Sequence, residues 1–466
     1  MNTLARLVTP QLPSIHRGKV RDSLRVDDST RLIVVTDRIS AFDSVLDTPI
    51  PGKGRVLNQI ANFWFDATRD IVANHVVREI DPCITLVHEA TPIRVEVIVR
   101  GYLAGSMWRG YQDGKRTFSG ASLPDGLSLN QRLPEPIVTP TTKEDSDEEI
   151  TPEGIVATGL ASEALYRRMH ETALKLYERG ARLLGERGLL LVDTKYEFGL
   201  LHDELILIDE IHTPDSSRFF ESDDYDRDPA HATQMDKEYV RQWLQANRDE
   251  DSGAYPSVLP EDVVIETARR YNELFARVTG QSVRPDLDDD APNRVYRNLL
   301  REGLILPGYV AIIMGSAADL PFARKLAEGV AKYGIKAELR IVSAHKNGER
   351  ILGMAEEYNA SLEPGAVLAV AGLSNGLGGA LAANLNLPVI SCPPFKDNVD
   401  LLTNVNSSLM MPSGTPAGTC VRPDNAVQLA LRALNLPRLR ERLSAEIDAN
   451  KLRLIEADTE ARGRES

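Results

Sequence analysis

The stretch VAIIMGSAADLPFARKLAEG, which spans Val310–Gly329, decides the fold of the second half of the chain. Its apolar run ends at Gly315 and Ser316, and apolar residues at helical spacing follow. Strict alternation of strand and helix predicts a parallel sheet with helices on both faces. Three further strand-like runs continue the alternation, at residues 336–342, 366–371 and 388–392.

The first 280 residues have a less regular pattern of strand-like and helical stretches. Short β-branched runs such as RLIVVTD and ELILIDE mix irregularly with helical stretches, which predicts an α+β domain. The segment VRPDLDDDAPN, rich in Pro and Asp, then indicates a linker. We therefore expect four regions, an α+β domain at 1–282, a linker at 283–308, a three-layer α/β/α domain like flavodoxin or Rossmann folds at 309–440, and a charged helical tail at 441–466.

The composition of the chain excludes several classes of partner and of cellular setting. The chain has 466 residues and a net charge of -14, which argues against nucleic acid or a membrane surface as the partner. The N-terminus lacks a basic segment followed by an apolar one, and no apolar run approaches the ~20 residues of a membrane span. Cys83, Cys392 and Cys420 are too scattered for a disulfide framework. We expect a cytoplasmic protein that acts on small molecules.

Polar or glycine-rich loops follow the predicted strands of the second half. Ligands collect at the carboxyl ends of the strands in such a sheet. Gly315 and Ser316, at a helix start, can offer backbone N–H groups and a hydroxyl to a phosphate. The imidazole of His345 can carry a proton at neutral pH, and Lys346 beside it can balance an anion. Alternatively, Ser343 caps a helix, His345 is a surface residue and the glycines serve turns.

Five segments resemble the 5-aminoimidazole ribonucleotide (AIR) carboxylase family over Tyr309–Leu436, namely MGSAADLPFARK, SAHKNGER, AVAGLSNGLGG, PVISCPPF and SSLMMPSGTPAGT. The combination of SAHK with SNGLGG is similar to the class found in animals, which uses CO2 directly without biotin or a metal. Leu373 stands where relatives often carry Arg, and the alternative is the class that rearranges an N-carboxylated nucleotide (N5-CAIR mutase). That class carries a His in the glycine-rich loop, which this chain lacks.

The resemblance implies roles for individual residues. His345 is implied to shuttle the proton at imidazole C4, a carbon that is already nucleophilic because aminoimidazole is an enamine. Ser374 and Asn375 are implied to line the CO2 pocket. Orientation, a dry pocket and a proton acceptor are then the main requirements. The implied substrate-binding residues of the carboxylase are Gly315, Ser316, Asp319, Ser343, Ala344, Lys346, Ser374, Asn375 and Gly376.

In the first half, HRGKVRD places Gly18 between basic residues, just before an apolar strand. Glycine permits close approach of the backbone to a ligand, and Lys19 and Arg21 could meet phosphate charge. A plain turn with solvated charges is the alternative.

The segment LVDTKYEFGLLHDELILIDE predicts a hairpin. A turn centred on Asp203 would place Glu197 opposite Asp209, ~5 Å apart on one face. Like charges so placed need neutralising, and Mg²⁺ typically sits between carboxylates and nucleotide phosphates. Lys195 alternates onto the same face. An exposed hairpin edge with solvated charge is the alternative.

With this hairpin, the segments GKVRD, TDRISAFD, VEVIVRGYLAGS, TPTTKEDSDEE, IHTPDSSRFF and MDKEYVRQWL resemble the SAICAR synthetase family, in its longer fungal form, over Leu12–Gly280. Lys195 is implied to be catalytic, because it would neutralise the transferring phosphoryl group. The implied ligands are ATP at Gly18, Lys19, Arg21 and Glu96, Mg²⁺ at Glu197 and Asp209, and the ligase substrates at Arg100, Ser106, Lys143, Asp215, Ser217 and Arg218.

The two resemblances support each other, because the carboxylase product (CAIR) is the ligase substrate. They imply a bifunctional purine-biosynthesis enzyme that uses ATP and Mg²⁺ but no biotin, and a homo-oligomer such as an octamer built around the carboxylase domain. A regulatory nucleotide-binding protein is a rival, but it would need neither His345 nor a metal between Glu197 and Asp209. An NAD-dependent oxidoreductase is disfavoured because the predicted strand that ends at Gly315 is not followed by the Gly-x-Gly-x-x-Gly pattern of dinucleotide-binding proteins.

Overall fold

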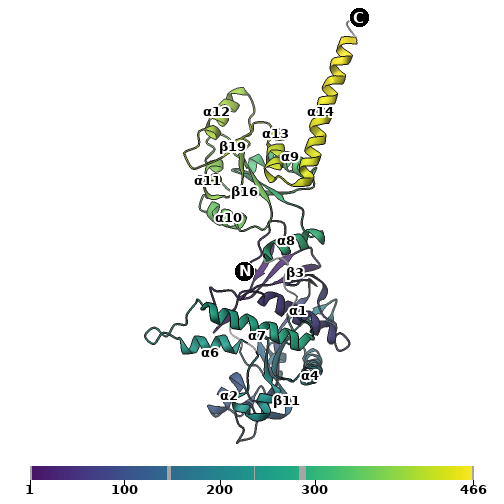
Figure 1. Cartoon of the computed structure of the whole chain (residues 1–466), viewed down its shortest axis with the longest axis vertical. Coiled ribbons are helices and arrows are strands. Elements are labelled where there is room, and N and C mark those ends of the chain that lie inside the picture. Colours follow the sequence, from purple (N-terminus) through teal and green to yellow (C-terminus); the bar gives the residue numbers. More distant parts are fainter. Residues whose placement is uncertain (1–2, 43, 144–147, 236, 283–289, 464–466) are drawn as a thin grey trace. The chain divides into compact units, whose positions relative to one another are not determined.

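The computed structural model divides into two compact units. Residues Met1–Arg6 and Ser14–Val295 form the first unit, and Leu7–Pro13 and Tyr296–Ser466 form the second. Figure 1 labels the elements of both. The structure describes residues 3–42, 44–143, 148–235, 237–282 and 290–463.

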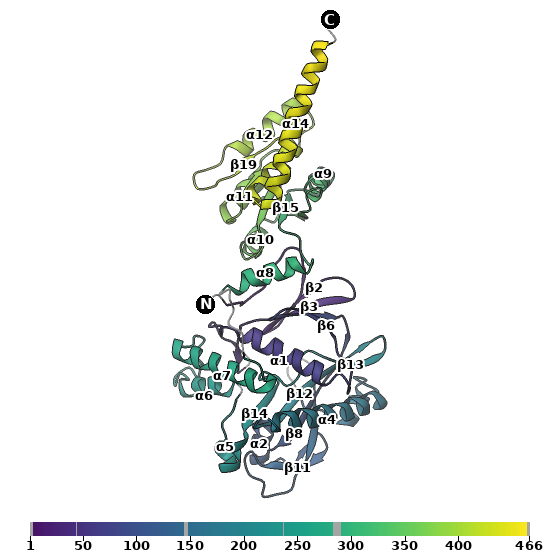
Figure 2. The same ribbon diagram turned by 45° about the vertical axis from the view of Figure 1, so that its right-hand side comes forward.

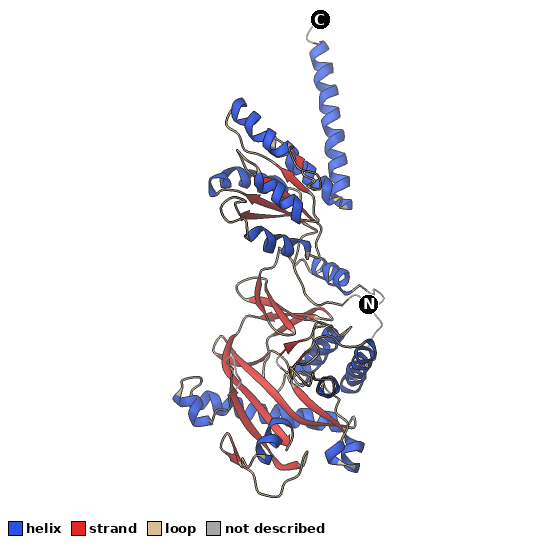
Figure 3. Cartoon of the chain, turned by 90° about the vertical axis from the view of Figure 1, so that its left-hand side faces the viewer, coloured by secondary structure: helices blue, strands red, loops and turns tan. Residues whose placement is uncertain are grey.

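The second unit is a three-layer α/β/α domain, as the sequence predicts. Its five strands are parallel, in the order β16-β15-β17-β18-β19. Helices lie on both sides of this sheet (Figure 3). The strands are β15 (Tyr309–Met314), β16 (Lys336–Ile341), β17 (Gly365–Val370), β18 (Val389–Ser391) and β19 (Gly418–Thr419), and the helices are α9 (Leu320–Ala331), α10 (Arg350–Asn359), α11 (Gly376–Asn384), α12 (Asn398–Leu409), α13 (Pro423–Leu434) and α14 (Pro437–Gly463).

Alternation along β15 explains the layers. Ile312 and Met314 pack in the core formed with α9 and α13. Ala311 and Ile313 point to the other face, in the core formed with α10 and α11. Every residue of this strand is buried, as a central parallel strand requires. The carboxyl ends of the strands therefore meet at one edge, where the polar loops begin.

Within the segment expected as a linker, α8 spans Ala291–Arg301, and the charged helical tail forms α14 (Pro437–Gly463). Leu439 and Leu443 bury the start of α14 in the core that includes α9 and α13, whereas residues 447–463 of this charged helix are exposed. No helix in the described part of the chain is long and apolar enough to span a membrane.

A short N-terminal segment, Leu7–Pro13, makes its contacts in the second unit. The side chains of Thr9 and Gln11 both donate to the buried carboxylate of Glu363. Gln11 also exchanges two hydrogen bonds of 2.9 Å with the backbone of Leu306. The sequence predicts this segment as part of the first domain, because local patterns carry no information about contacts with residues about 350 positions away.

The first unit is an α+β domain with two five-stranded sheets. One has the order β1-β2-β3-β7-β6, and the other has the order β11-β8-β12-β13 with β14 also paired to β12. Its strands are β1 (Ser14–Arg17), β2 (Arg21–Arg25), β3 (Thr30–Val35), β4 (Ser40–Ala41), β5 (Ser44–Val45), β6 (Val76–Asp81), β7 (Ile84–His88), β8 (Thr91–Tyr102), β9 (Thr117–Phe118), β10 (Ala121–Ser122), β11 (Arg132–Thr142), β12 (Leu189–Leu201), β13 (Glu204–Ile208) and β14 (Ser217–Glu221).

Helices bury one face against these sheets. In α4 the buried positions Met169, Ala173 and Leu176 recur at helical spacing, and the helix packs across β8 and β12 (Figure 2). The Ser162 side chain begins α4 by accepting a hydrogen bond from the Leu165 N–H. The helices of this unit are α1 (Lys53–Ala67), α2 (Gly105–Gln112), α3 (Pro152–Ala157), α4 (Glu163–Gly185), α5 (Ser222–Arg227), α6 (Glu238–Ala246) and α7 (Glu261–Thr279).

Candidate functional site

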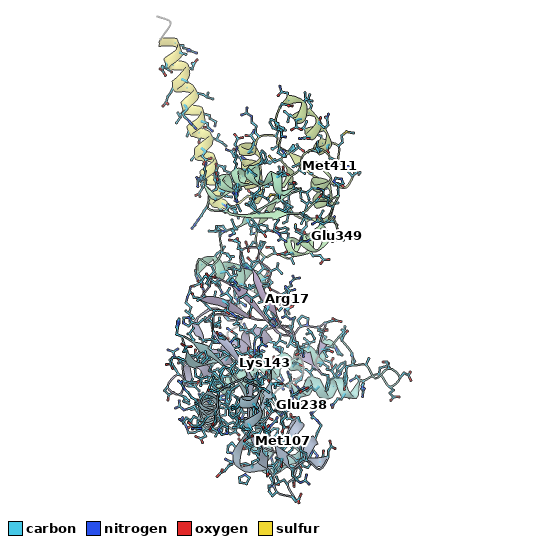
Figure 4. All side chains as sticks on the ribbon, turned by 180° about the vertical axis from the view of Figure 1, so that it is seen from behind. Arg17, Met107, Lys143, Glu238, Glu349 and Met411 are labelled. Carbon is cyan, nitrogen blue, oxygen red and sulfur yellow. The ribbon has the colours of Figure 1, made fainter. Side chains whose placement is uncertain are left out.

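A cluster of charged side chains lies on β8 and β12 in the first unit. Glu96 and Glu197 are direct cross-strand partners, and both are buried. The Nζ of Lys195 lies 2.6 Å from Glu96 and 3.8 Å from Glu197. Lys143, labelled in Figure 4, forms an ion pair with Glu197. Alternation along β12 thus brings Lys195 and Glu197 to one face, as predicted.

The predicted hairpin is present, but its predicted register is wrong by one residue. Glu197 pairs with Ile208, and the strand ends before Asp209. The turn consists of two residues, His202 and Asp203, which both have positive φ. Such a turn favours the twist of a tight hairpin and leaves an even number of residues between paired positions. The carboxylate directly opposite Glu197 is therefore Glu96 of β8.

Asp209 nevertheless lies close to Glu197. Its φ of 65° turns the chain out of the strand. Burial and the nearby charge of Asp209 raise the pKa of Glu197 to about 7, although Lys143 and Lys195 oppose this. Burial alone would raise the pKa of Asp209, but Arg21, Lys143 and Lys195 lower it to about 2. The pair therefore carries an unfavourable density of negative charge that a further cation would relieve.

Arg21 lies beneath this pair rather than in an open loop. It forms a 2.9 Å ion pair with Asp209 and another with buried Glu210. These carboxylates raise its pKa despite the opposing effect of burial. The preceding turn is tight, because Gly18 donates to the Arg21 carbonyl at 2.7 Å and a Cβ on Gly18 would lie 3.0 Å from that oxygen. Exposed Lys19 lies in this turn.

Two arginines share one carboxylate at the other end of β12. Asp193 forms ion pairs with Arg100, at 3.5 Å, and with Arg218. Gly105, at the start of α2, has a φ of 58°, and a Cβ there would come within 2.4 Å of the Arg218 guanidinium. Arg100 and exposed Ser106 also line a cavity of about 240 Å³. Both predicted substrate residues thus reach one hollow, which the structure builds from β8, β11 and α2.

Asp215 belongs to a buried ion pair that no local sequence pattern predicts. The Nζ of Lys53 lies 2.9 Å from Asp215 Oδ2, and the Lys53 side chain is completely buried. Burial lowers the pKa of Lys53, against the opposing charge of Asp215. Ser217, two residues beyond Asp215, is buried and donates to Thr194 at 2.8 Å. The sequence feature that could have pointed to Lys53 is its position between Gly52 and Gly54. A side chain is excluded at Gly54, because a Cβ there would lie 2.3 Å from the Val35 carbonyl oxygen.

The second unit has a cavity of about 790 Å³ at the carboxyl edge of its sheet. The loops after β15, β16 and β17 meet there, as predicted. Of the predicted residues it is lined by Gly315, Ser316, Asp319, Ser343, Ala344, His345 and Ser374. Burial raises the pKa of Asp319. The remaining lining includes four residues that the sequence analysis did not select, Lys325, Lys396, Asp400 and Asn404.

His345 packs beside the first turn of α11. A Cβ on Gly376 would lie 3.0 Å from the imidazole Cε1 and 3.1 Å from Nε2, so the missing side chain of Gly376 makes room for the ring. The imidazole itself is exposed and lines the cavity. Gly376 thus has a packing role next to the implied proton carrier.

Three predicted residues, Lys346, Asn375 and Gly376, are not among the cavity lining. Lys346 is exposed. Asn375 is buried, and its amide donates to Ser391 and Ser408 at 2.9 Å while its oxygen accepts from the Gly378 N–H. Asn375 therefore holds the glycine-rich loop in place as the N-cap of α11.

The donor set of the first unit fits a magnesium ion. The described residues contain no group of three or more His, Cys, Asp or Glu side chains arranged as metal ligands. Mg²⁺, however, is usually held by one or two carboxylates together with substrate phosphates and water. Glu197 and Asp209 supply such a pair, and burial together with the charge of Asp209 raises the pKa of Glu197 to about 7.

Comparison with known proteins matches each unit to an enzyme family. Residues 14–257 match the family model of SAICAR synthetase. The chain belongs to the SAICAR synthetase family. Residues 309–453 match the family model of AIR carboxylase, so this family member carries a second enzyme-family domain in the same chain.

The matches to relatives of the SAICAR synthetase part extend over almost the whole length of each relative. The "putative phosphoribosylaminoimidazole-succinocarboxamide synthase 2" of Agrobacterium fabrum is 44% identical over 313 residues, which are 64% of this chain and 98% of the relative. A relative from Cytophaga hutchinsonii is 43% identical over 302 residues, 64% of this chain and 97% of its own. The SAICAR synthase of Saccharomyces cerevisiae, solved in complex with SAICAR, is 37% identical with a TM-score of 0.54, covering 60% of this chain and 99% of that one.

Proposed function

We propose that this chain catalyses two consecutive steps of purine biosynthesis. The second unit carboxylates AIR to CAIR, and the first unit joins CAIR to L-aspartate with ATP to give SAICAR, ADP and phosphate. The observation that carries the proposal is the cluster of partly exposed Lys195 with buried Glu96 and Glu197 in one unit, together with the His345 cavity in the other. The yeast relative was solved with SAICAR bound, which supports the ligase product.

The ligase step needs positive charge at the phosphates more than covalent chemistry from the protein. The imidazole carboxylate of CAIR attacks the γ-phosphorus, ADP leaves, and the aspartate amine displaces phosphate from the acyl phosphate. Lys195 and Lys143, which pair with Glu96 and Glu197, would offset the charge of the transferring phosphoryl group. The Gly18–Lys19 turn and Glu96 would contact ATP, while Arg21 acts from beneath by holding Asp209.

Glu197 and Asp209 would hold Mg²⁺. When bound, the ion supplies charge neutralisation at the phosphate oxygens. Among the proposed substrate-binding residues, the positively charged and hydroxyl side chains would bind the nucleotide phosphate. A carboxylate would bind the amine of the aspartate substrate. The proposed substrate-binding residues are Arg100, Ser106, Lys143, Asp215, Ser217 and Arg218.

In the second unit, His345 would accept the proton that leaves C4 when the C–C bond to CO2 forms. The enamine pushes electrons towards C4, so the site mainly orients AIR and keeps CO2 beside it. Most of the residues proposed to hold AIR line the cavity around His345. Asn375 and Gly376 support its loops, Lys346 follows His345 in the chain, and the step uses no biotin. The residues proposed to hold AIR are Gly315, Ser316, Asp319, Ser343, Ala344, Lys346, Ser374, Asn375 and Gly376.

Two variants test the assignment of the two reactions. We expect His345→Asn to abolish CAIR formation from AIR and bicarbonate while ATP-dependent ligation of supplied CAIR continues. Glu197→Gln should abolish ligation and leave carboxylation intact. Each variant is the control for the other, and loss of both activities in either variant would contradict two separate sites. Supplying N-carboxylated AIR to the wild type separates a mutase from a CO2-using carboxylase.

We also propose that the enzyme works in the cytoplasm as a homo-oligomer, such as an octamer assembled through the carboxylase units. Exposed apolar side chains on α12, including Val399, Leu402 and Leu409, support a contact between protomers. Light scattering of the purified chain measures the number of subunits, and a monomeric mass at working concentration would contradict this.

A further inference from the structure

The side chain of Arg38 contacts the turn that joins β1 to β2 in the first unit. Its Nε donates to the Lys19 carbonyl at 3.0 Å, and its Nη2 donates to the Gly18 carbonyl at 3.0 Å. Its Nη1 donates to the Ala5 carbonyl at 2.6 Å. The carboxylate of buried Asp22 accepts from Nη2 at 2.8 Å and from Nη1 at 3.3 Å. One side chain thereby holds two consecutive carbonyls of the turn.

These contacts use every donor of the guanidinium group. Arginine has five N–H donors and no acceptor. In Arg38 two donors point to the turn, one to Ala5 and two to Asp22. The side chain of Arg38 is 15% exposed, and that of Asp22 is 2% exposed. All five donors are therefore engaged within the protein, and Arg38 can act on a ligand only through the turn.

The next carbonyl of the turn is also held by the segment that carries Arg38. The Val20 carbonyl accepts from the Thr36 N–H at 3.0 Å and from the Thr36 hydroxyl at 2.7 Å. In a trans peptide, the carbonyl of one residue and the N–H of the next point in opposite directions. The N–H groups of Lys19 and Val20 therefore point away from Arg38. Successive N–H groups of a turn, arranged in this way, suit the phosphate of a nucleotide.

The backbone beside Arg38 is itself held on two sides. Asp37 is buried, and its carboxylate accepts from the N–H groups of Leu4 and Gly54 at 2.8 and 2.9 Å. The Asp37 N–H donates to the Leu4 carbonyl at 2.9 Å. Gly54 lies in the first turn of α1. Because its backbone is fixed in this way, Arg38 can hold the turn in one conformation.

We propose that Arg38 is a positioning residue for the phosphates of ATP, which holds the Gly18–Lys19 turn in its nucleotide-binding conformation before ATP arrives. The inference rests on the ligase function proposed for the first unit. A site that is already formed does not have to be ordered when its ligand binds, so the affinity is higher. If the unsupported turn adopts the binding conformation about a tenth of the time, the dissociation constant of the nucleotide rises about tenfold.

Three variants separate positioning from stability. Arg38→Met removes all five donors and leaves the charge of Asp22 buried without its partner, so it should also lower the unfolding temperature. Adding Asp22→Asn removes that charge. We expect the double variant to be more stable than Arg38→Met and yet to bind ADP on the order of tenfold more weakly than the wild type, as Arg38→Met does.

Arg38→Lys keeps a charge beside Asp22 and therefore provides the same test without an unpaired buried carboxylate. Lysine carries its donors on one atom rather than on a planar fork, so it cannot hold both carbonyls of the turn and Asp22 together. We expect this variant to bind ADP with an affinity between those of the wild type and Arg38→Met.

Arg179→Met is the matched control. Arg179 of α4 also joins a backbone carbonyl to a carboxylate, since it donates to the Ala67 carbonyl at 2.8 Å and to Asp70 at 2.8 Å. Its side chain is 28% exposed and belongs to the same folded unit. Because these contacts lie outside the turn, their loss should leave the dissociation constant of ADP unchanged within about twofold.

Titration calorimetry with ADP and Mg²⁺ measures the dissociation constant, and ligase kinetics measure KM for ATP and for CAIR. We expect KM for ATP to rise in the Arg38 variants while KM for CAIR and kcat stay nearly unchanged, because the turn is ordered once ATP saturates it. In the absence of nucleotide, the amides of Lys19 and Val20 should exchange hydrogen faster in Arg38→Met than in the wild type.

Wild-type affinity for ADP in the double variant and in Arg38→Lys overturns the inference, as does an equal loss of affinity in Arg179→Met. An increase in KM for CAIR as large as that for ATP also overturns it. A wild type that neither binds ADP nor ligates CAIR defeats the proposed function of the first unit, and the inference falls with it. An active wild type with unaffected Arg38 variants defeats only the inference.

Discussion

Replacing Lys53 by methionine tests whether the buried pair with Asp215 organises the ligase site. Methionine keeps most of the volume of the lysine stem but removes the ammonium group, which lies 2.9 Å from Asp215. Asp215 is itself only 7% exposed, and its pKa, which burial would raise, is held low chiefly by Lys53. The variant therefore leaves a carboxylate without its main counter-charge, inside protein and out of reach of bulk water.

Leaving one partner of a buried ion pair uncompensated typically costs about 3–5 kcal/mol. With a urea dependence of roughly 2 kcal/mol per molar, the midpoint of unfolding should fall by about 1.5–2.5 M. Arg167→Met removes an ion pair with Glu163 in which both side chains are more than half exposed, and its cost should stay below about 1 kcal/mol. Adding Asp215→Asn to Lys53→Met should recover most of the loss in stability, because no charge is then left buried.

Tryptophan fluorescence follows this unfolding in the first unit alone, since all three tryptophans, Trp64, Trp108 and Trp243, belong to it. Ligation should fall in Lys53→Met, because Asp215 loses the group that orients it, while carboxylation in the second unit is unchanged. A midpoint no lower than that of Arg167→Met would refute the reasoning, as would a double variant no more stable than the single one.

Three further outcomes are expected. Burial lowers the pKa of His212 to about 3, so the unfolded chain takes up this proton first as pH falls. His212 should therefore contribute a drop of roughly 2 kcal/mol to the unfolding free energy of the first unit from about pH 7.5 to about pH 5; His212→Gln should reduce the pH dependence by that amount, and exposed His231→Gln should not. Gly376→Ala should push the imidazole of His345 aside and slow carboxylation by on the order of a hundredfold, with Gly353→Ala as control because its new Cβ meets nothing within 4 Å. Chelation of Mg²⁺ should stop ligation and spare carboxylation; equal losses would count against the metal assignment.

The sequence predicts the second unit well because its fold follows from local patterns. Each buried parallel strand is one continuous apolar run, and each strand ends where a polar or glycine-rich loop begins. The loops containing Ser316, His345 and Ser374 therefore had to meet at one edge of the sheet, and they do. The orientation of Asn375 was not predictable, because its partners Ser391 and Ser408 come from other elements.

The first unit shows where local patterns stop being sufficient. The hairpin was predictable, but its register depends on whether the turn has two or three residues, and a slip by one moves every cross-strand partner. The sequence therefore identified Glu197, Lys195 and Asp209 but not that Glu96 lies directly opposite Glu197. Lys53 was missed because its partner lies 162 positions away, a separation about which no periodicity carries information.

The route of the chain limits how the two halves can be taken apart. Because Leu7–Pro13 lies in one folded body while the residues on both sides of it lie in the other, the backbone passes between the bodies after Arg6, again after Pro13 and a third time after Val295. A gene truncated to its carboxylase half would lack the hydroxyl and amide that satisfy Glu363, and would yield a product with an orphaned internal carboxylate. Separate expression would require grafting the N-terminal peptide onto the carboxylase fragment. The folded carboxylase-like unit therefore includes residues from near the N-terminus of the chain as well as its C-terminal part.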